Sequence, residues 1–481
     1  MHSILNLALF QATWETIYMV FISSALGILG GSLLGVLLFV TQEPQFSKNR
    51  VVYHSVGAVV NLVRSVPFII LLISIVPLTR LIVGTAIGTN AAIVPLVLAA
   101  IPFYARICET ALAAVPKGLI EVGHAMGASQ RQIITKILLP ESSAALVKGA
   151  ALTIIGLIGY STMAGAIGGG GLGELAINYG YQRFDVWVMT STVVVLLLIV
   201  QGVQSLADTV VKRRKVKLAL WLCIPFAFIC IFSQTSSYFM APKNVLRVGV
   251  MSGSPEVIMA VAATEAKEKY GLTLKIVPFS DYMQPNMALD NGDIDANIFQ
   301  HKLFLDDQLK AKHYAIVAIA KTFVYPFGFY SQKIKNIAEL KPGALIALPN
   351  DPSNEGRALM LLQNAHLIRL APKVTLVGTV RDIISNPKHL KFKVLDGAQL
   401  PRVLKDADLV GINNDFLLPA GLNVQMAILV EGSDSPYANL IVVRKDDVDN
   451  PHMKEFIAVM HSKAVVDVTE KEFDGGAVPA W

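Results

Sequence analysis

The chain has little cysteine and little charge for its length. Its 481 residues include only 3 Cys, and 16% are Asp, Glu, Lys or Arg. Cys108, Cys223 and Cys230 all lie in apolar segments, so a disulfide framework is excluded and buried free thiols are the simplest interpretation. The low charge and the 53% hydrophobic content are typical of a membrane protein joined to something soluble.

The chain also lacks the motifs of an enzyme. Gly168–Gly173 is rich in glycine, but no Gly-Lys-Ser/Thr follows it, which excludes a phosphate-binding loop. The C-terminal half shows no nucleophile–base pairing, and His301 has no second metal ligand at helical spacing. We therefore expect no catalytic residue, no metal site and no cofactor bound by this chain.

Net positive charge is confined to one half of the chain. Residues 1–217 hold 15 Lys and Arg against 8 Asp and Glu, whereas the remainder holds 26 against 27. The basic excess thus belongs to the apolar half, where it orients membrane helices. Nucleic-acid binding is not expected.

Six apolar stretches are long enough to cross a bilayer, since a spanning helix needs about 20 largely apolar residues. They are roughly 14–40, 57–79, 88–113, 146–168, 187–211 and 217–236. Positive residues are concentrated in alternate connections, and positive loops face the cytoplasm. We therefore expect the N-terminus outside, segment 121–140 inside, and the chain after about Ser237 on the outer face.

The sixth stretch resembles a retained signal sequence. Lys212–Lys215 is basic and Leu218–Phe232 is apolar. Neither Cys223 nor Cys230 follows the small residues that a lipidated cysteine usually has. We favour an uncleaved membrane anchor, with lipidation or cleavage as the alternatives.

From Val245 onward the pattern is that of a soluble α/β domain. Short apolar runs such as Leu246–Val250 and Leu409–Ile412 alternate with helical stretches such as Pro255–Tyr270. This order predicts parallel sheets with crossover helices. About 240 residues suit two lobes, and we place the two crossings between them near 323–330 and 431–437.

The segment from Glu121 to Pro140 is polar and helix-forming, and it lies between two apolar stretches. Gly127 comes six residues after Glu121, and Ile137-Leu138-Leu139-Pro140 begins sixteen residues after it. This spacing resembles the coupling helix of ABC-importer permeases. The resemblance implies an all-α transmembrane bundle of the type I importer class, pairing as a homodimer, with Glu121, Gly127, Ile137, Leu139 and Pro140 coupling it to a separate ATPase subunit that uses ATP.

Several segments of the C-terminal half resemble the methionine-binding lipoprotein family. They include Phe279–Tyr282, Gly292–His301, Thr322–Pro326, Asn350–Asn354, Ile412-Asn413, Ser435–Leu440 and Gly475–Trp481. The first half, from about Trp14 to Lys215, likewise resembles the methionine-importer permease. The expected organisation is a permease of five spans over 1–216, an anchor and linker over 217–244, and an α/β bilobal binding domain like the periplasmic binding proteins over 245–481.

The same resemblance points to a methionine site. Tyr282, Phe299 and Phe304 would surround the thioether with His301 as a polar wall, because sulfur packs well at ring edges. Arg357, just after the cap sequence Asp351–Asn354, suits the carboxylate, and Asn413 and Asn439 suit the amino group. On spacing alone, Phe299 and Phe304 are more typical of a core, and Asn413-Asn414 of a turn.

The expected function is import of methionine across a bacterial inner membrane, with the binding domain on the outer side and lipid around the spans. Two alternatives stay open. One is an osmoprotectant importer for betaine or choline, although such ligands favour an aromatic cage and the soluble half has Trp481 as its one tryptophan. The other is a membrane-anchored amino-acid sensor, although the chain offers only short cytoplasmic loops for an output.

Overall fold

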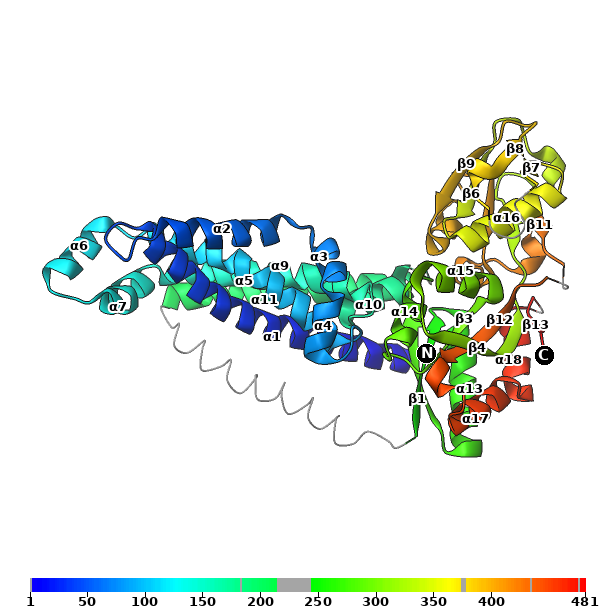
Figure 1. The fold of residues 1–481 in the computed structure, drawn as a ribbon, viewed down its shortest axis with the longest axis horizontal. Helices are drawn as coiled ribbons and strands as arrows, with labels where there is room; N and C mark the ends of the chain where they lie inside the picture. The colour runs from blue at the N-terminus through cyan, green and yellow to red at the C-terminus, as the bar shows by residue number, and fades with distance from the viewer. Residues whose placement is uncertain (1, 182–183, 214–243, 373–377, 433–434, 475) are drawn as a thin grey trace. The chain divides into compact units, whose positions relative to one another are not determined.

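The computed structural model describes residues 2–181, 184–213, 244–372, 378–432, 435–474 and 476–481. The chain divides into two compact units, Met1–Ile177 with Trp187–Ala241 and Asn178–Val186 with Pro242–Trp481. The first is helical and the second contains the sheets (Figure 1). The expected sixth span over 217–236, with Cys223 and Cys230, lies outside the described residues.

Four helices of the first unit are long and apolar enough to cross a membrane. They are α1 (His2–Gln42), α5 (Thr89–Ala113), α9 (Ser143–Gly165) and α11 (Val186–Arg213). They match the stretches expected at 14–40, 88–113, 146–168 and 187–211. The chain is thus a multi-span membrane protein.

The span expected at 57–79 is wrong as a single straight helix. The structure has α2 (Arg50–Ser65) and α3 (Phe68–Ser74), bent by 103° at the break, followed by α4 (Val76–Val83). Pro67 lies at the break and has no N–H to continue the helix. The pair counts as one broken span or as a re-entrant segment.

Small residues bring α1 and α5 into close contact. Gly27, Gly31 and Gly35 lie four residues apart on one face of α1. A Cβ on Gly31 would lie 2.8 Å from the carbonyl oxygen of Ile101, and one on Gly35 would lie 2.6 Å from that of Ala105. Membrane helices pack through such small residues because their backbones can then approach each other.

The segment 121–140 is not one helix. It comprises part of α6 (Lys117–Ala125), then α7 (Gln130–Ile133), a π-helical turn (Ile134–Leu138) and α8 (Leu139–Glu141). The break falls at Gly127, whose φ of +73° is left-handed. A capping box between Ser129 and Gln132 then starts α7.

The predicted coupling residues lie in different environments within that segment. Glu121 is exposed, whereas Ile137 and Leu139 pack against the apolar cluster that contains Phe39 and Ile133. Gly123 lets α6 lie close to the π-helical turn, because a Cβ on Gly123 would be 2.9 Å from Ile137 Cδ1. The apolar side chains thus hold the segment to the rest of the helical unit, while Glu121 is exposed.

The glycine-rich segment 168–173 directs its N–H groups at α1. Gly171 N–H donates to Glu15 at 2.8 Å, and Leu172 N–H donates to Thr16 Oγ1 at 2.8 Å. These donors bind a carboxylate and a hydroxyl within the helical unit. They connect α10 (Gly171–Leu175) to the first span.

The second unit has two lobes, each built on a sheet. The first sheet has the order β13-β4-β12-β3-β1-β2 and the second has the order β11-β5-β10-β6-β9. The strands of the first are β1 (Val245–Met251), β2 (Thr273–Phe279), β3 (Ala296–His301), β4 (Ile316–Val324), β12 (Ala438–Arg444) and β13 (Val478–Pro479). Those of the second are β5 (Gly328–Tyr330), β6 (Leu345–Pro349), β9 (Lys391–Leu395), β10 (Leu409–Ile412) and β11 (Leu429–Val430). A separate pair joins β7 (Arg369–Leu370) to β8 (Ile383–Ser385).

The helices follow the strands as crossover connections. They are α13 (Ser254–Tyr270), α14 (Gln284–Asp290), α15 (Lys302–Lys312), α16 (Pro352–Asn364), α17 (Pro451–Met460) and α18 (Lys463–Glu472). Leu246, Val248 and Phe456 lie in the core of the first lobe, and Ile346, Leu359 and Leu409 in that of the second. β6 and β10 are apolar and buried along almost their whole length, as expected for strands that helices cover.

The prediction of parallel sheets is right for β1, β2 and β3 and for β6, β9 and β10, but wrong for β5 and β12, which follow the crossings between the lobes. β1 runs parallel to β2 and β3, and β6 runs parallel to β9 and β10. β12 is antiparallel to β3 and β4, and β5 is antiparallel to β10 and β11. β5 and β12 are the first strands that the chain forms after each crossing from one lobe to the other. The crossings lie at 325–327 and 431–437, within the predicted ranges.

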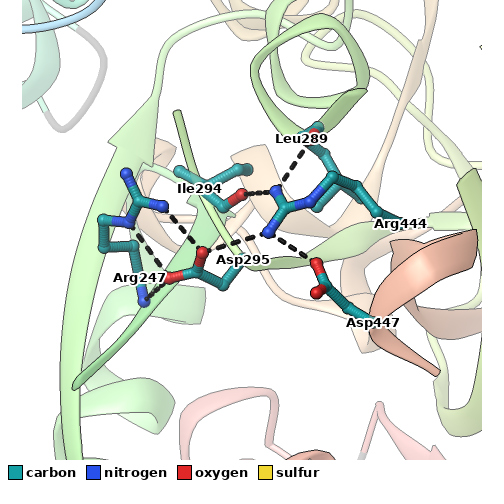
Figure 2. A network of polar contacts seen from close by, with 6 residues as sticks. All are labelled: Arg247, Leu289, Ile294, Asp295, Arg444 and Asp447. Carbon is teal, nitrogen blue, oxygen red and sulfur yellow. Dashed lines mark hydrogen bonds and ion pairs between the residues drawn. The ribbon is translucent and has the colours of Figure 1, made fainter. Parts of the chain in front are cut away.

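An ion-pair network links β1 to the start of β3 and the end of β12 (Figure 2). Asp295 accepts hydrogen bonds from Arg247 Nη2 at 2.7 Å and from Arg247 Nε at 3.0 Å. Arg444 Nη2 contacts the same carboxylate at 3.2 Å and that of Asp447 at 2.6 Å. Two cations thus share two carboxylates where the chain enters the sheet.

Candidate ligand-binding site

A small cavity lies between the two lobes, with polar and aromatic side chains around it. It is lined by all seven residues predicted to bind ligand: Tyr282, Phe299, His301, Phe304, Arg357, Asn413 and Asn439. They come from both lobes and from positions far apart in the sequence. The structure therefore brings the predicted set together around one space.

Arg357 lies in the first turns of α16 and is 4% exposed. Its Nε donates to Glu431 Oε1 at 2.7 Å, and its Nη2 donates to Glu431 Oε2 and to the Tyr325 carbonyl oxygen. The guanidinium also lies 4.2 Å from the ring centroid of Tyr437. One edge of the guanidinium is thus occupied, which leaves Nη1 for a ligand.

His301 ends β3 and caps the helix that follows. Its Nδ1 accepts the N–H of Phe304 at 3.3 Å, so in the neutral ring the proton is on Nε2. Burial, together with the Arg357 charge, lowers the pKa of His301 to about 3. His301 is therefore a neutral donor whose buried Nε2 has no hydrogen-bond partner among the described residues.

Asn413 is held by the cap of α16. Its Nδ2 donates to Asn354 Oδ1 at 2.9 Å, and Asn354 Nδ2 donates to Asp351 at 3.0 Å. With its amide nitrogen fixed, Asn413 presents Oδ1, a buried acceptor with no partner among the described residues. Asn439 lies on β12, directly opposite His301 in the register.

The aromatic side chains form one cluster on the other side of the cavity. Tyr282 lies 6.0 Å from Phe299 and 6.2 Å from Phe304 between ring centroids, and Phe299 lies 5.6 Å from Phe304. Phe416 from the second lobe joins them, 5.8 Å from Tyr282. The cluster offers ring faces and edges to an apolar side chain.

A buried amide network supports the strand that carries Phe299 and His301. Asn286 Nδ2 donates to Gln300 Oε1 at 2.7 Å, and Asn297 Nδ2 donates to Asn286 Oδ1 at 3.0 Å. Each of the three side chains is at most 2% exposed. The network fixes β3 against α14, and so fixes the residues that line the cavity.

Sequence reasoning missed Asp415, Phe416, Glu431 and Tyr437. The first two follow Asn413-Asn414 directly in the turn after β10, so the position of Asn413 was a usable signal for them. Glu431 and Tyr437 lie in the predicted second crossing. A carboxylate at a crossing was a usable signal for a partner to Arg357.

The arrangement can bind and orient a small zwitterion. It contains a cation, a neutral ring donor, amide acceptors and an aromatic slot, each at a different part of one cavity. Within the part of the chain that the structure describes, no cluster of three metal-ligating side chains is present. Chemically, the site is suited to recognition.

Comparison with known proteins gives two family matches. Residues 246–481 match the NlpA lipoprotein family. Residues 9–216 match the family described as the binding-protein-dependent transport system inner membrane component. Between them the two families cover nearly the whole chain.

Individual relatives resemble one half of the chain. The D-methionine-binding lipoprotein MetQ of Salmonella typhi is 48% identical over 241 residues, which are 50% of this chain and 89% of that protein. A methionine-binding protein MetQ of known structure is 47% identical over 50% of this chain and 98% of its own, with a TM-score of 0.49. A nutrient binding protein from Burkholderia cenocepacia, solved bound to methionine, is 46% identical over 49% of this chain and 100% of its own, with a TM-score of 0.48.

Proposed function

Because the chain belongs to the NlpA lipoprotein family through residues 246–481, we propose that its two-lobed unit captures methionine outside the cell. The chain joins that unit to an ABC-importer permease, matched over residues 9–216. The organisation that follows is a permease over 1–216, an anchor and linker over 217–244 and a binding domain over 245–481. Capture and passage are then carried out by one polypeptide.

The single observation that carries the proposal is a pair of unsatisfied polar atoms in one cavity. His301 Nε2 is a buried donor and Asn413 Oδ1 a buried acceptor, and neither has a partner among the described residues. Arg357 adds a positive charge at the same cavity. An α-amino acid presents a carboxylate and an ammonium on one carbon, so it would satisfy all three groups.

The side chain of the ligand follows from the aromatic cluster. Tyr282, Phe299 and Phe304 pack against one another and line the cavity, so a flexible thioether bound there would contact aromatic rings. The Salmonella relative, 48% identical, is a D-methionine-binding lipoprotein. Shape, chemistry and relatives therefore support the same ligand.

The import cycle we propose follows the permease family. Two permease units pair around a pathway, and each rests its segment 121–140 on one subunit of a separate ATPase. ATP binding would move these segments and turn the pathway outward, where the bound lobes release methionine. Glu121 is exposed in α6 as such a contact requires.

Calorimetry on the full chain in lipid nanodiscs tests the ligand. We expect heat from at least one stereoisomer of methionine and none from leucine or glycine betaine at the same concentration. Arg357→Ala should abolish that heat, while Arg381→Ala, at an exposed position, should keep it. Preferential binding of betaine would instead indicate an osmoprotectant importer.

Transport in proteoliposomes tests the rest of the proposal. With the partner ATPase and ATP, labelled methionine should accumulate inside vesicles that contain this chain. The matched control has the ATPase without ATP. A chain that binds methionine but never accumulates it would be a sensor.

A further inference from the structure

Asp415 is a buried carboxylate in the ligand cavity. It belongs to the short 3-10 turn Asn414–Phe416 that follows β10, and it is 8% exposed. Tyr282, from the other lobe, donates its hydroxyl hydrogen to Asp415 Oδ2 at 3.0 Å. Asp415 lines the same cavity as Arg357 and Asn413.

The nearest positive charge does not neutralise this carboxylate directly. Arg357 directs its Nε and Nη2 at Glu431, and no ion pair of Asp415 occurs among the residues the structure describes. A buried ionised carboxylate loses its hydration, and one hydrogen bond from a neutral hydroxyl offsets only part of that cost. Asp415 thus lies in the cavity as an anion that lacks a cation in contact.

A bound amino acid would bring that cation. Its ammonium group and its carboxylate are attached to the same carbon. When the carboxylate contacts Arg357, the ammonium therefore lies within a few ångströms of that side chain, in the cavity that Asp415 also lines. Asn413 Oδ1 is available to accept a hydrogen bond from the ammonium, but a neutral amide accepts equally from an uncharged N–H. A carboxylate adds discrimination by charge.

We propose that Asp415 is the counter-ion of the ligand's α-ammonium group, and that the site therefore selects amino acids with a free, charged amine. This inference rests on the proposed function and specifies its substrate class. N-acylated amino acids and carboxylic acids without the amine would be excluded. The Tyr282 hydroxyl, which belongs to the aromatic slot, orients the carboxylate from the opposite lobe.

The test compares two ligands with two forms of the full chain in nanodiscs. The ligands are methionine and 4-(methylthio)butanoate, which is methionine without its amino group. The forms are the wild type and Asp415→Asn, which keeps an acceptor for Tyr282 and removes the charge. We expect the wild type to bind methionine at least about 30-fold more tightly than the des-amino acid, as for a desolvated charge pair.

The variant should close that gap. Asp415→Asn should weaken methionine about 30-fold or more and leave the affinity of the des-amino acid within about twofold. Asp446→Asn, at an exposed position in the same domain, is the matched control and should bind both ligands as the wild type does. N-acetylmethionine should bind the wild type no better than the des-amino acid.

Each other outcome has a definite meaning. Equal losses for both ligands in Asp415→Asn would show a structural role and overturn the inference, as would methionine binding that survives the substitution. If the variant does not fold, the wild type still decides, because equal affinity for the two ligands overturns the inference. If the wild type binds neither stereoisomer of methionine, the proposed function is overturned as well. This result can be told apart from equal binding of the two ligands.

Discussion

Glu431 and Arg357 form a two-pronged ion pair that connects the cavity to both crossings between the lobes. Glu431 Oε1 accepts from Arg357 Nε at 2.7 Å, and its Oε2 accepts from Phe327 N–H at 3.1 Å. Phe327 lies on the first crossing and Glu431 on the second. The orientation of Arg357, the cation that we propose binds the ligand, is therefore set by the same residue that connects the two crossings.

Removing one member of this pair should reduce both binding and stability. We expect Arg357→Ala to weaken methionine binding by about 2–5 kcal/mol. It should also lower the free energy of unfolding by about 3–5 kcal/mol, because it leaves Glu431 as an unpaired carboxylate. Calorimetry and chemical denaturation of the full chain measure the two effects separately.

The double variant Arg357→Ala with Glu431→Gln separates the two roles. Without the unpaired charge, part of the lost stability should return, while methionine binding should stay lost. If the double variant is as unstable as the single one, the two residues are not coupled in the way the geometry indicates. If Arg357→Ala weakens methionine binding by less than about 0.5 kcal/mol, which is well short of a tenfold change in affinity, Arg357 does not bind the ligand.

Methionine binding should weaken in mild acid. Burial raises the pKa of Asp415 to about 6, although the Tyr282 hydrogen bond and the Arg357 charge oppose the rise. A bound ammonium favours the ionised carboxylate, so affinity should be complete above pH 6 and should fall up to about tenfold per pH unit below it. The measurement is a series of calorimetric titrations from about pH 5 to about pH 8, a range that brackets this pKa.

Other groups near Asp415 set the control for this pH series. Arg357 stays charged, and His301 stays neutral because its pKa is lowered to about 3. Burial also raises the pKa of Asp351 at the cap of α16. Asp415→Asn should therefore remove the dependence and Asp351→Asn should keep it. The opposite pattern would assign the titration to Asp351.

Some strands were predictable from the sequence because their signal is local. Lys391–Leu395 and Leu409–Ile412 are strands with the predicted bounds, although only the second is buried along its whole length. Arg357 was predictable because Asp351 and Pro352 start a helix just before it. These features are local, so a single stretch of sequence contains the signal.

The remaining features depend on contacts between distant residues. Glu431 reaches Arg357 across 74 positions of sequence, and Tyr282 reaches Asp415 across 133. No periodicity in either segment indicates such a partner. The antiparallel β12 was missed for the same reason, since its direction is set by the crossing from the other lobe and not by its own residues.

Asp295 should stabilise the first lobe at neutral pH and lose that effect in acid. Burial would raise its pKa, but hydrogen bonds from Arg247 and Arg444 outweigh burial and lower it (Figure 2). The stabilisation is thus complete above the unfolded value of about 3.9 and is lost as the pH falls through the lower folded value. Asp295→Asn should cost about 1–3 kcal/mol at pH 7.

Hydrogen exchange of the full chain reports this loss locally. Peptides from β1 and β3 should exchange faster in Asp295→Asn than in the wild type at pH 7. Asp446→Asn, at an exposed position on the same lobe, should leave both peptides protected. Equal protection in all three proteins would show that the network contributes nothing measurable.

Gly127 should matter for coupling to the ATPase and not for ligand binding. Its φ of +73° disfavours any side chain by about 1–2 kcal/mol, although the space around it is open. We expect Gly127→Val to reduce methionine-stimulated ATP hydrolysis by the partner subunit, with calorimetric affinity for methionine unchanged. Gly118→Val is the matched control, because its surroundings are equally open and its φ is not left-handed. If both variants lose coupling equally, the turn is not responsible.

The contact between α1 and α5 should tolerate no added methyl group at Gly31. A Cβ there would lie 2.8 Å from the carbonyl oxygen of Ile101 and 3.1 Å from the nitrogen of Ala105, both backbone atoms. Because neither atom can rotate away, the two helices must separate, which costs about 1–3 kcal/mol by overpacking. Gly31→Ala should therefore melt at a lower temperature in detergent, as followed by loss of the monodisperse peak in size-exclusion chromatography. The control is Gly156→Ala on α9, where no atom lies within 4 Å of the added Cβ. It should melt at the wild-type temperature or slightly higher, since alanine favours a helix. A Gly31→Ala protein as stable as this control would show that α1 and α5 are not in close contact.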